Sequence, residues 1–219
     1  MVQGSAPRAR LSAEALAGER HALASATLKR VLTILKTLVA QIDVLETITP
    51  LNFLAFRDRL ESGSGFQSHQ FREIEFILGK KARPSFERYP EGSVSRERVQ
   101  SRFNQPTLWD AFLHYLAANE YRVPKTLLQR DYSKGYEPSP EVQRILVEVY
   151  KKNPKVAQIV ERLVDLDEGF MEWRYRHVKM VQRTIGTKPG TGGSAGAEYL
   201  LTTLNQPAFP DLWAIRAEL

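Results

Sequence analysis

The sequence predicts an all-α protein: a single helical-bundle domain whose long helices are joined by Gly- and Pro-rich connecting loops. Apolar residues recur at steps of three and four along several long segments, the spacing of a helix with one buried face. No segment alternates convincingly between apolar and polar residues, so strands are not expected. The 219 residues suffice for one sizeable core. We expect an irregular N-terminal segment at 1–21 and the helical domain at 22–219.

The first long helix is expected between Leu11 and Ile48, a stretch rich in Ala and Leu. One face carries an apolar stripe made of Leu28, Val31, Leu35, Leu38, Ile42 and Leu45, and off it lie Lys29, Arg30, Lys36 and Gln41. Thr49 followed by Pro50 is typical of an N-cap and a first helical position, so a second helix begins there. This helix is expected to end at the small-residue loop 61–65.

The middle of the chain alternates helices with loops. A helix is expected at about 67–78, because Gly79 suits the end of a helix. Residues 80–106 are polar and contain three prolines, which indicates a connection with a short helix at 95–103. A helix at 107–118 then precedes a second loop-rich stretch at 119–140.

The C-terminal third is expected to form helices at about 140–151, 155–186, 195–204 and 210–219. The second of them has a histidine on its apolar stripe, which consists of Leu163, Leu166, Phe170, Trp173, His177, Val181 and Thr184. A buried imidazole needs a partner. A core histidine hydrogen-bonded to a neighbour is the more frequent arrangement, and a metal ligand is the alternative. These residues alone leave both open.

Composition excludes several classes of site. The chain has no cysteine, which rules out disulfides, zinc fingers, iron–sulfur clusters and cysteine nucleophiles. Its 31 basic and 25 acidic residues give a net charge of +6, which suits a solvated surface better than a nucleic-acid partner. No apolar run approaches a membrane span, and the opening lacks the apolar core of a secretory signal. We expect a soluble, cytoplasmic protein with no membrane or nucleic acid as partner.

Two small-residue loops could approach a ligand closely. Gly190–Ala195 formally fits the dinucleotide-binding glycine pattern, but a long helix rather than a strand precedes it, so that site is rejected. Its backbone N–H groups could instead meet a flat or anionic ligand, and the alternative is a mobile surface loop. Ser62–Gly65 is a second loop of this kind. Together the two loops suggest room for a bulky planar ligand.

Arg57 lies one helical turn beyond Phe53, so the two side chains share a helix face. A guanidinium beside an aromatic ring suits a carboxylate on an apolar body, and the alternative is a surface ion pair with Asp58 or Glu61. The histidines outside the long C-terminal helix receive no role. A single histidine is a poor site for a bare metal ion but an ordinary one for haem, whose porphyrin supplies four further ligands.

Two long segments resemble the hallmark segments of the tryptophan 2,3-dioxygenase family. They are LETITPLNFLAFRDRLESGSGFQSHQFREIEFILG at Leu45–Gly79 and EWRYRHVKMVQRTIGTKPGTGGSAG at Glu172–Gly196, and the resemblance runs from about Ala22 to the C-terminus. It implies an all-helical, homotetrameric enzyme with haem b that inserts both atoms of O₂ across the indole C2–C3 bond of L-tryptophan. The product is N-formyl-L-kynurenine, the first intermediate of tryptophan catabolism by the kynurenine pathway.

The resemblance also implies roles for individual residues. His177 matches the proximal, axial ligand of the haem iron. Arg57 matches the arginine that holds the substrate carboxylate, Thr191 matches the threonine at the substrate's amino-acid end, and Phe53 replaces a tyrosine of the indole pocket. The other expected cofactor contacts are Ser64, Gly65, Gly190 and Gly192.

One departure from the family concerns the start of the sequence. Family members begin with a further helical region, whose His-Gln-Thr-Ser-Glu-Leu-Trp segment supplies the distal histidine above the haem. The opening MVQGSAPRARLSAEAL does not resemble it. We therefore expect a family member shortened at its N-terminus, in which no catalytic residue is identified. The alternative to an active dioxygenase is a catalytically silent member that serves only as a haem-binding or helical scaffold.

Overall fold

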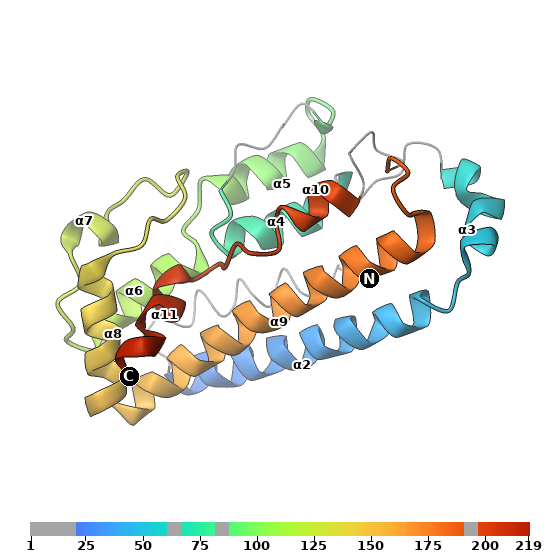
Figure 1. Ribbon diagram of the computed structural model, residues 1–219. Helices are drawn as coiled ribbons and strands as arrows, with labels where there is room; N and C mark the ends of the chain where they lie inside the picture. Colours follow the sequence, from blue (N-terminus) through green and yellow to red (C-terminus); the bar gives the residue numbers. More distant parts are fainter. Residues whose placement is uncertain (1–20, 61–66, 82–87, 191–196) are drawn as a thin grey trace.

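The computed structural model describes residues 21–60, 67–81, 88–190 and 197–219, and these residues form helices and no strand. The two longest described helices, α2 (His21–Leu45) and α9 (Pro154–Ile185), lie side by side along the molecule (Figure 1). The shorter helices gather along one side and at the two ends of this pair (Figure 1). The predicted all-α fold class is confirmed. None of the described helices is both long enough and apolar enough to cross a membrane.

Local sequence signals set several helix boundaries. The remaining elements, in chain order, are α3 (Pro50–Arg57), η2 (Asp58–Leu60), α4 (His69–Ile77), α5 (Val94–Phe103), α6 (Leu108–Ala118), α7 (Lys125–Leu128), α8 (Pro140–Lys152), α10 (Ala197–Leu201), α11 (Pro210–Ala214) and η5 (Ile215–Glu218). The Thr49 hydroxyl accepts a hydrogen bond from the Asn52 N–H, as expected of an N-cap. Gly79 ends α4 with a φ of +89°, a conformation that favours glycine.

The described helices match the expected ones closely, and the differences have local causes. The first helix ends at Leu45 rather than Ile48, because Thr49 before Pro50 is extended and cannot continue a helix. Residues 11–20 of that expected helix lie outside the described residues. The predicted loop at 119–140 contains the one-turn helix α7, which starts directly after Pro124. The expected last helix is divided into α11 and the 3₁₀ turn η5.

The main core lies around the N-terminal half of α9. The buried aromatic side chains of α6 fill it, and Trp109 stacks on Phe209 with 5.4 Å between ring centroids. Asp167 of α9 is 1% exposed and accepts hydrogen bonds from the backbone N–H groups of Ala208 and Phe209 and from the Trp213 indole. These bonds fix the C-terminal segment on α9, and this half of the helix is therefore rigidly held.

Candidate functional site

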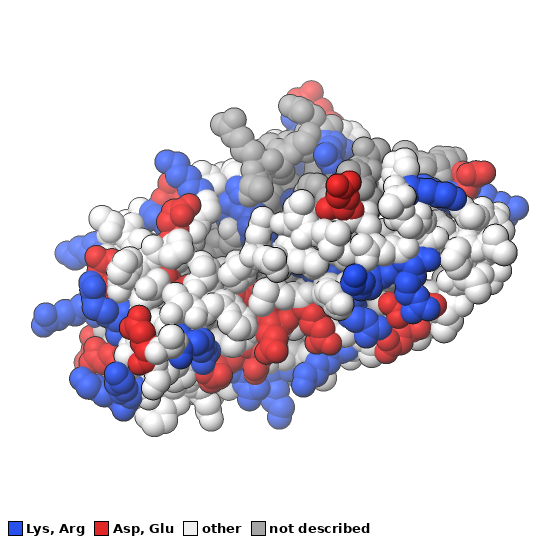
Figure 2. Space-filling model, viewed as in Figure 1, with Lys and Arg blue, Asp and Glu red and all other residues white. Residues whose placement is uncertain are grey.

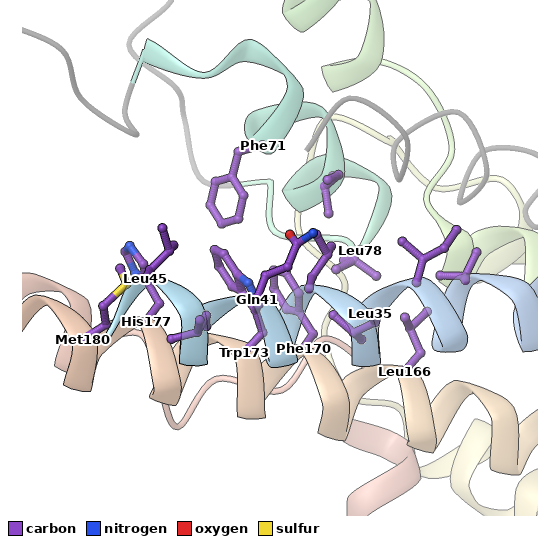
Figure 3. Close-up of a pocket in the computed structure, with 15 residues that line it drawn as sticks. Leu35, Gln41, Leu45, Phe71, Leu78, Leu166, Phe170, Trp173, His177 and Met180 are labelled. Carbon is purple, nitrogen blue, oxygen red and sulfur yellow. The ribbon is translucent and has the colours of Figure 1, made fainter. Parts of the chain in front are cut away.

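An apolar cavity of about 210 Å³ lies between α2, α4 and α9 (Figure 3). It adjoins the main core, with which it shares Leu35, Leu166 and Phe170, and it extends along the C-terminal half of α9. Its walls are the apolar stripes of the three helices, with members Val31, Ile34, Leu35, Leu38, Gln41, Ile42 and Leu45 from α2, Phe71, Ile74 and Leu78 from α4 and its C-cap, and Leu166, Phe170, Trp173, His177 and Met180 from α9. An imidazole and a carboxamide are thus surrounded by hydrocarbon and aromatic groups.

His177 is half-buried in the cavity wall, and its ring is stacked on Trp173 with 5.3 Å between centroids and 3° between planes. Neither ring nitrogen has a hydrogen-bond partner among the described residues. Burial lowers the pKa of His177 below 6.5, so the ring is neutral at pH 7 and keeps a basic nitrogen. A hydrogen bond from His177 to a core neighbour, which the residues alone favoured, is therefore not found among the described residues.

Charged pairs hold the two long helices together on either side of His177. The Arg176 guanidinium of α9 binds the carboxylates of Asp43 and Glu46 near the end of α2, with 3.3 Å to Glu46. Arg183 binds the same Glu46 at 3.1 Å. Because these pairs lie one residue before His177 and six after it, they keep the α2 wall of the cavity in register with α9.

A second polar network attaches α4, which forms the other wall. Arg174 of α9 is buried, binds the Glu75 carboxylate at 3.4 Å and donates to the Thr203 carbonyl at 2.8 Å. Arg72 also binds Glu75, so a partly buried carboxylate lies between two guanidinium groups. Such a network fixes the α4 backbone and with it the ring of Phe71 above the cavity (Figure 3).

Arg57 brings α3 to the loop that follows α9. Its guanidinium donates a hydrogen bond of 2.7 Å to the Pro189 carbonyl, 132 residues away in sequence. It forms no ion pair with Asp58, and the other expected partner, Glu61, lies outside the described residues. Helix α3 and the segment just before the glycine-rich loop thus meet at one end of the α2–α9 pair (Figure 1). Both carry or adjoin residues that were expected to bind the substrate.

The other expected site residues lie outside the cavity wall or outside the described residues. Phe53 is half-buried and packs edge-on against Phe56, with 5.2 Å between centroids, and neither it nor Arg57 lines the cavity. Gly190 is the last described residue before the glycine-rich loop. The remaining members, Ser64, Gly65, Thr191 and Gly192, lie outside the described residues. Of the expected residues that the structure describes, His177 alone lies in the cavity wall.

Sequence reasoning missed part of the cavity lining. Gln41 is expected off the apolar stripe of α2 and received no role, yet its side chain lines the cavity. The wall is wider than the stripe, and Gln41 stands at steps of three and four from Leu38 and Leu45. That spacing was a usable signal. Trp173 was on the predicted stripe of α9, but nothing in the spacing indicates a stack with His177.

The cavity suits one kind of metal site. Among the described residues, no three His, Asp or Glu side chains are grouped as a bare ion requires. A lone neutral imidazole in an apolar wall is the donor set that haem needs, since the porphyrin supplies the other ligands and buries its flat faces against hydrocarbon. The residues present therefore fit a haem more readily than a free metal ion.

Comparison with known proteins gives a consistent result. The sequence model of the tryptophan 2,3-dioxygenase family matches residues 6–125 and 140–219. The tryptophan 2,3-dioxygenase of Herpetosiphon aurantiacus is 59% identical over 196 residues, which are 90% of this chain and 75% of that protein. Those of Anaeromyxobacter sp. (strain K) and Caulobacter vibrioides are 56% and 40% identical, over 91% and 95% of this chain and 74% and 81% of theirs. The chain therefore belongs to the tryptophan 2,3-dioxygenase family.

Proposed function

We propose that this chain is a haem-dependent dioxygenase that converts L-tryptophan and O₂ to N-formyl-L-kynurenine. Its family membership supports the reaction. The observation that carries the cofactor assignment is the neutral imidazole of His177 in an apolar cavity, without a hydrogen-bond partner among the described residues. Haem b, when bound, supplies an iron centre at which O₂ can react with the substrate. The protein's own residues do the binding, orienting and water exclusion.

His177 is the residue that would hold the haem iron. Because burial favours its neutral form, a ring nitrogen is ready to bind iron without first losing a proton. The apolar side chains of α2, α4 and α9 exclude water from that nitrogen and offer surfaces to a flat ring. The proposed loop contacts to the cofactor are Ser64, Gly65, Gly190 and Gly192.

Arg57 is the proposed carboxylate-binding residue of the substrate site. A guanidinium has five N–H donors. Its one hydrogen bond to a described residue, with the Pro189 carbonyl, uses one of these donors and orients the side chain, and a bidentate carboxylate would use two of the others. Phe53 is proposed to face the indole and Thr191 the amino-acid end of tryptophan. This arrangement would orient the substrate by the end that does not react.

The surface agrees with a soluble, oligomeric enzyme. Acidic and basic side chains are interspersed over the face shown in Figure 2, so the described residues form no continuous basic area for nucleic acid on this face. Apolar side chains of α3 and η2 are exposed, with Leu51 at 78%, Phe56 at 38% and Leu60 at 40%. Exposed apolar surface of this kind is commonly buried between subunits. We propose a cytoplasmic homotetramer, by resemblance to the family.

The experiment that tests the function combines haem uptake with isotope labelling. Wild-type protein titrated with haem should develop a Soret band, and His177→Ala should weaken or shift that band. His114→Ala is the matched control, because His114 is also half-buried but lies on α6 outside the cavity. With ¹⁸O₂, the product should contain two ¹⁸O atoms by mass spectrometry. A wild-type protein that takes up no haem, or loaded protein without turnover above free haem, contradicts the proposal.

A further inference from the structure

Aromatic rings connect α4 to His177 through Trp173. Trp173 lies one turn before His177 on α9, and the two rings are stacked nearly parallel. The indole also contacts Phe71 of α4, with 5.6 Å between centroids, and Phe170, with 6.3 Å and 11° between planes. Figure 3 shows Phe170, Trp173 and His177 along α9 and Phe71 above them on α4. Rings from two helices therefore hold the indole while the indole covers the imidazole.

The described residues offer His177 no other orienting contact. Metal-ligating histidines usually donate their second ring N–H to a carboxylate, a carbonyl or water, and this hydrogen bond fixes the ring. No described side chain or carbonyl accepts such a bond from His177. The guanidinium groups of Arg174 and Arg176 on the same helix cannot accept such a bond, and both bind carboxylates. A flat neighbour is then the group that determines how the imidazole lies.

We propose that Trp173 is a positioning residue for the haem ligand, because its indole fixes the rotation of the His177 imidazole about the Cβ–Cγ bond. This inference rests on the proposed function, since Trp173 acts only through His177. Rotation about a terminal sp³–sp² bond is otherwise broad and weakly restricted. A branched aliphatic side chain at position 173 would keep the position apolar, but it is smaller and has no flat face, so it would let the imidazole rotate. The flat shape of the Trp173 ring, and not its hydrophobicity alone, orients the imidazole.

The stack itself can be tested without haem. With only four histidines in the chain, ¹⁵N-histidine labelling gives few imidazole signals, and His177→Gln assigns the one of interest. Its ring protons should show an upfield ring-current shift that Trp173→Leu abolishes and Trp173→Phe largely keeps. Tyr175→Leu is the matched control, because Tyr175 is an aromatic residue of the same helix and 51% exposed. An unchanged shift in Trp173→Leu overturns the inference.

The consequence for the ligand is tested in haem-loaded protein. Trp173→Leu should raise the rate of haem loss to a scavenger roughly two- to twelvefold, the equivalent of about 0.5–1.5 kcal/mol for an aromatic pair. It should also broaden the ferric electron paramagnetic resonance signals, because the imidazole plane would then take several orientations. Trp173→Phe should restore both properties most of the way to wild type. Circular dichroism checks the fold, and Trp173→Met replaces Trp173→Leu if the leucine variant does not fold.

The two possible failures give different results. A wild-type protein that binds no haem overturns the proposed function and removes the role of Trp173 with it. A wild-type protein that binds haem, while Trp173→Leu changes neither the rate of loss nor the line width, overturns the positioning role alone. Equal effects of Trp173→Leu and Trp173→Phe would also overturn it, because the ring would then have no special part.

Discussion

The two halves of α9 differ in the hydrogen bonding of a polar side chain. In the N-terminal half, the Asp167 carboxylate accepts three hydrogen bonds, of 2.8 and 3.1 Å from the N–H groups of Ala208 and Phe209 and of 2.9 Å from the Trp213 indole. Ten residues later, His177 has none among the described residues. A polar group whose hydrogen bonds are complete stabilises the fold, whereas one without partners in a dry wall is available to a ligand.

Gly169 marks the boundary between these halves. A Cβ atom at this position would lie 2.9 Å from Cδ2 of Leu35 on α2, so the glycine permits a close approach of the two long helices. Leu35 is also a lining residue of the cavity. Beyond this contact the cavity continues along the two helices as far as Leu45 and Met180. The difference between the halves is thus one of packing as well as of hydrogen bonding.

The largest effect should come from removing the carboxylate in the packed half. Asp167→Ala leaves two backbone N–H groups and an indole N–H without acceptors in a buried place, so we expect a loss of about 3–5 kcal/mol in the free energy of unfolding. Urea denaturation measures it. Asp165→Ala is the control, because Asp165 is exposed on the same helix and should change stability by less than about 0.5 kcal/mol. Equal effects of the two variants would contradict the structural role of Asp167.

Removing Arg57 should affect binding at the other end of the molecule and leave the fold intact. Losing a charge-assisted pair in a closed site typically costs about 2–5 kcal/mol, so Arg57→Ala should weaken tryptophan binding by one or more orders of magnitude. Haem uptake should stay nearly unchanged, since Arg57 does not line the cavity. Calorimetry with tryptophan and with tryptamine, which lacks the carboxylate, measures it. Equal affinity of wild type for both ligands would show that no carboxylate is recognised.

The packed half was easier to predict from sequence than the open half. The stripe at Leu163 and Leu166 follows from helical period, as the helix boundaries at Thr49 and Gly79 elsewhere in the chain follow from capping chemistry, and both are local properties. The stack of Trp173 on His177 and the hydrogen bond from Arg57 to Pro189 depend on side-chain rotamers and on contacts distant in sequence. No spacing rule contains that information. The residue types were predictable, and their mutual geometry was not.

A smaller change, at Gly169, should affect stability and haem uptake in opposite directions. Gly169→Ala gives the interior of α9 a better helix former, worth up to about 1 kcal/mol, and the Leu35 methyl group can yield by moving into the cavity. Apo-protein stability should therefore stay level or rise, while haem uptake weakens because the cavity narrows. Melting temperature and haem titration measure the two effects. Gly135→Ala, where a Cβ meets nothing within 4 Å, is the control and should leave haem uptake unchanged.

The smallest effect concerns a histidine beside the packed half, where a hydrogen bond is present. His21 Nδ1 lies 2.8 Å from the Tyr115 hydroxyl, and burial together with the charge of Lys155 lowers the pKa of His21 below 6.5. Because the folded state then binds a proton less readily than the unfolded chain, His21 favours folding fully above pH 6.5, and this contribution is lost as pH falls through the lowered pKa. The urea midpoint of unfolding should fall between pH 7.5 and pH 5, and it should fall less for His21→Gln than for wild type. If the two proteins show the same pH dependence, the hydrogen-bonded histidine does not couple folding to protonation.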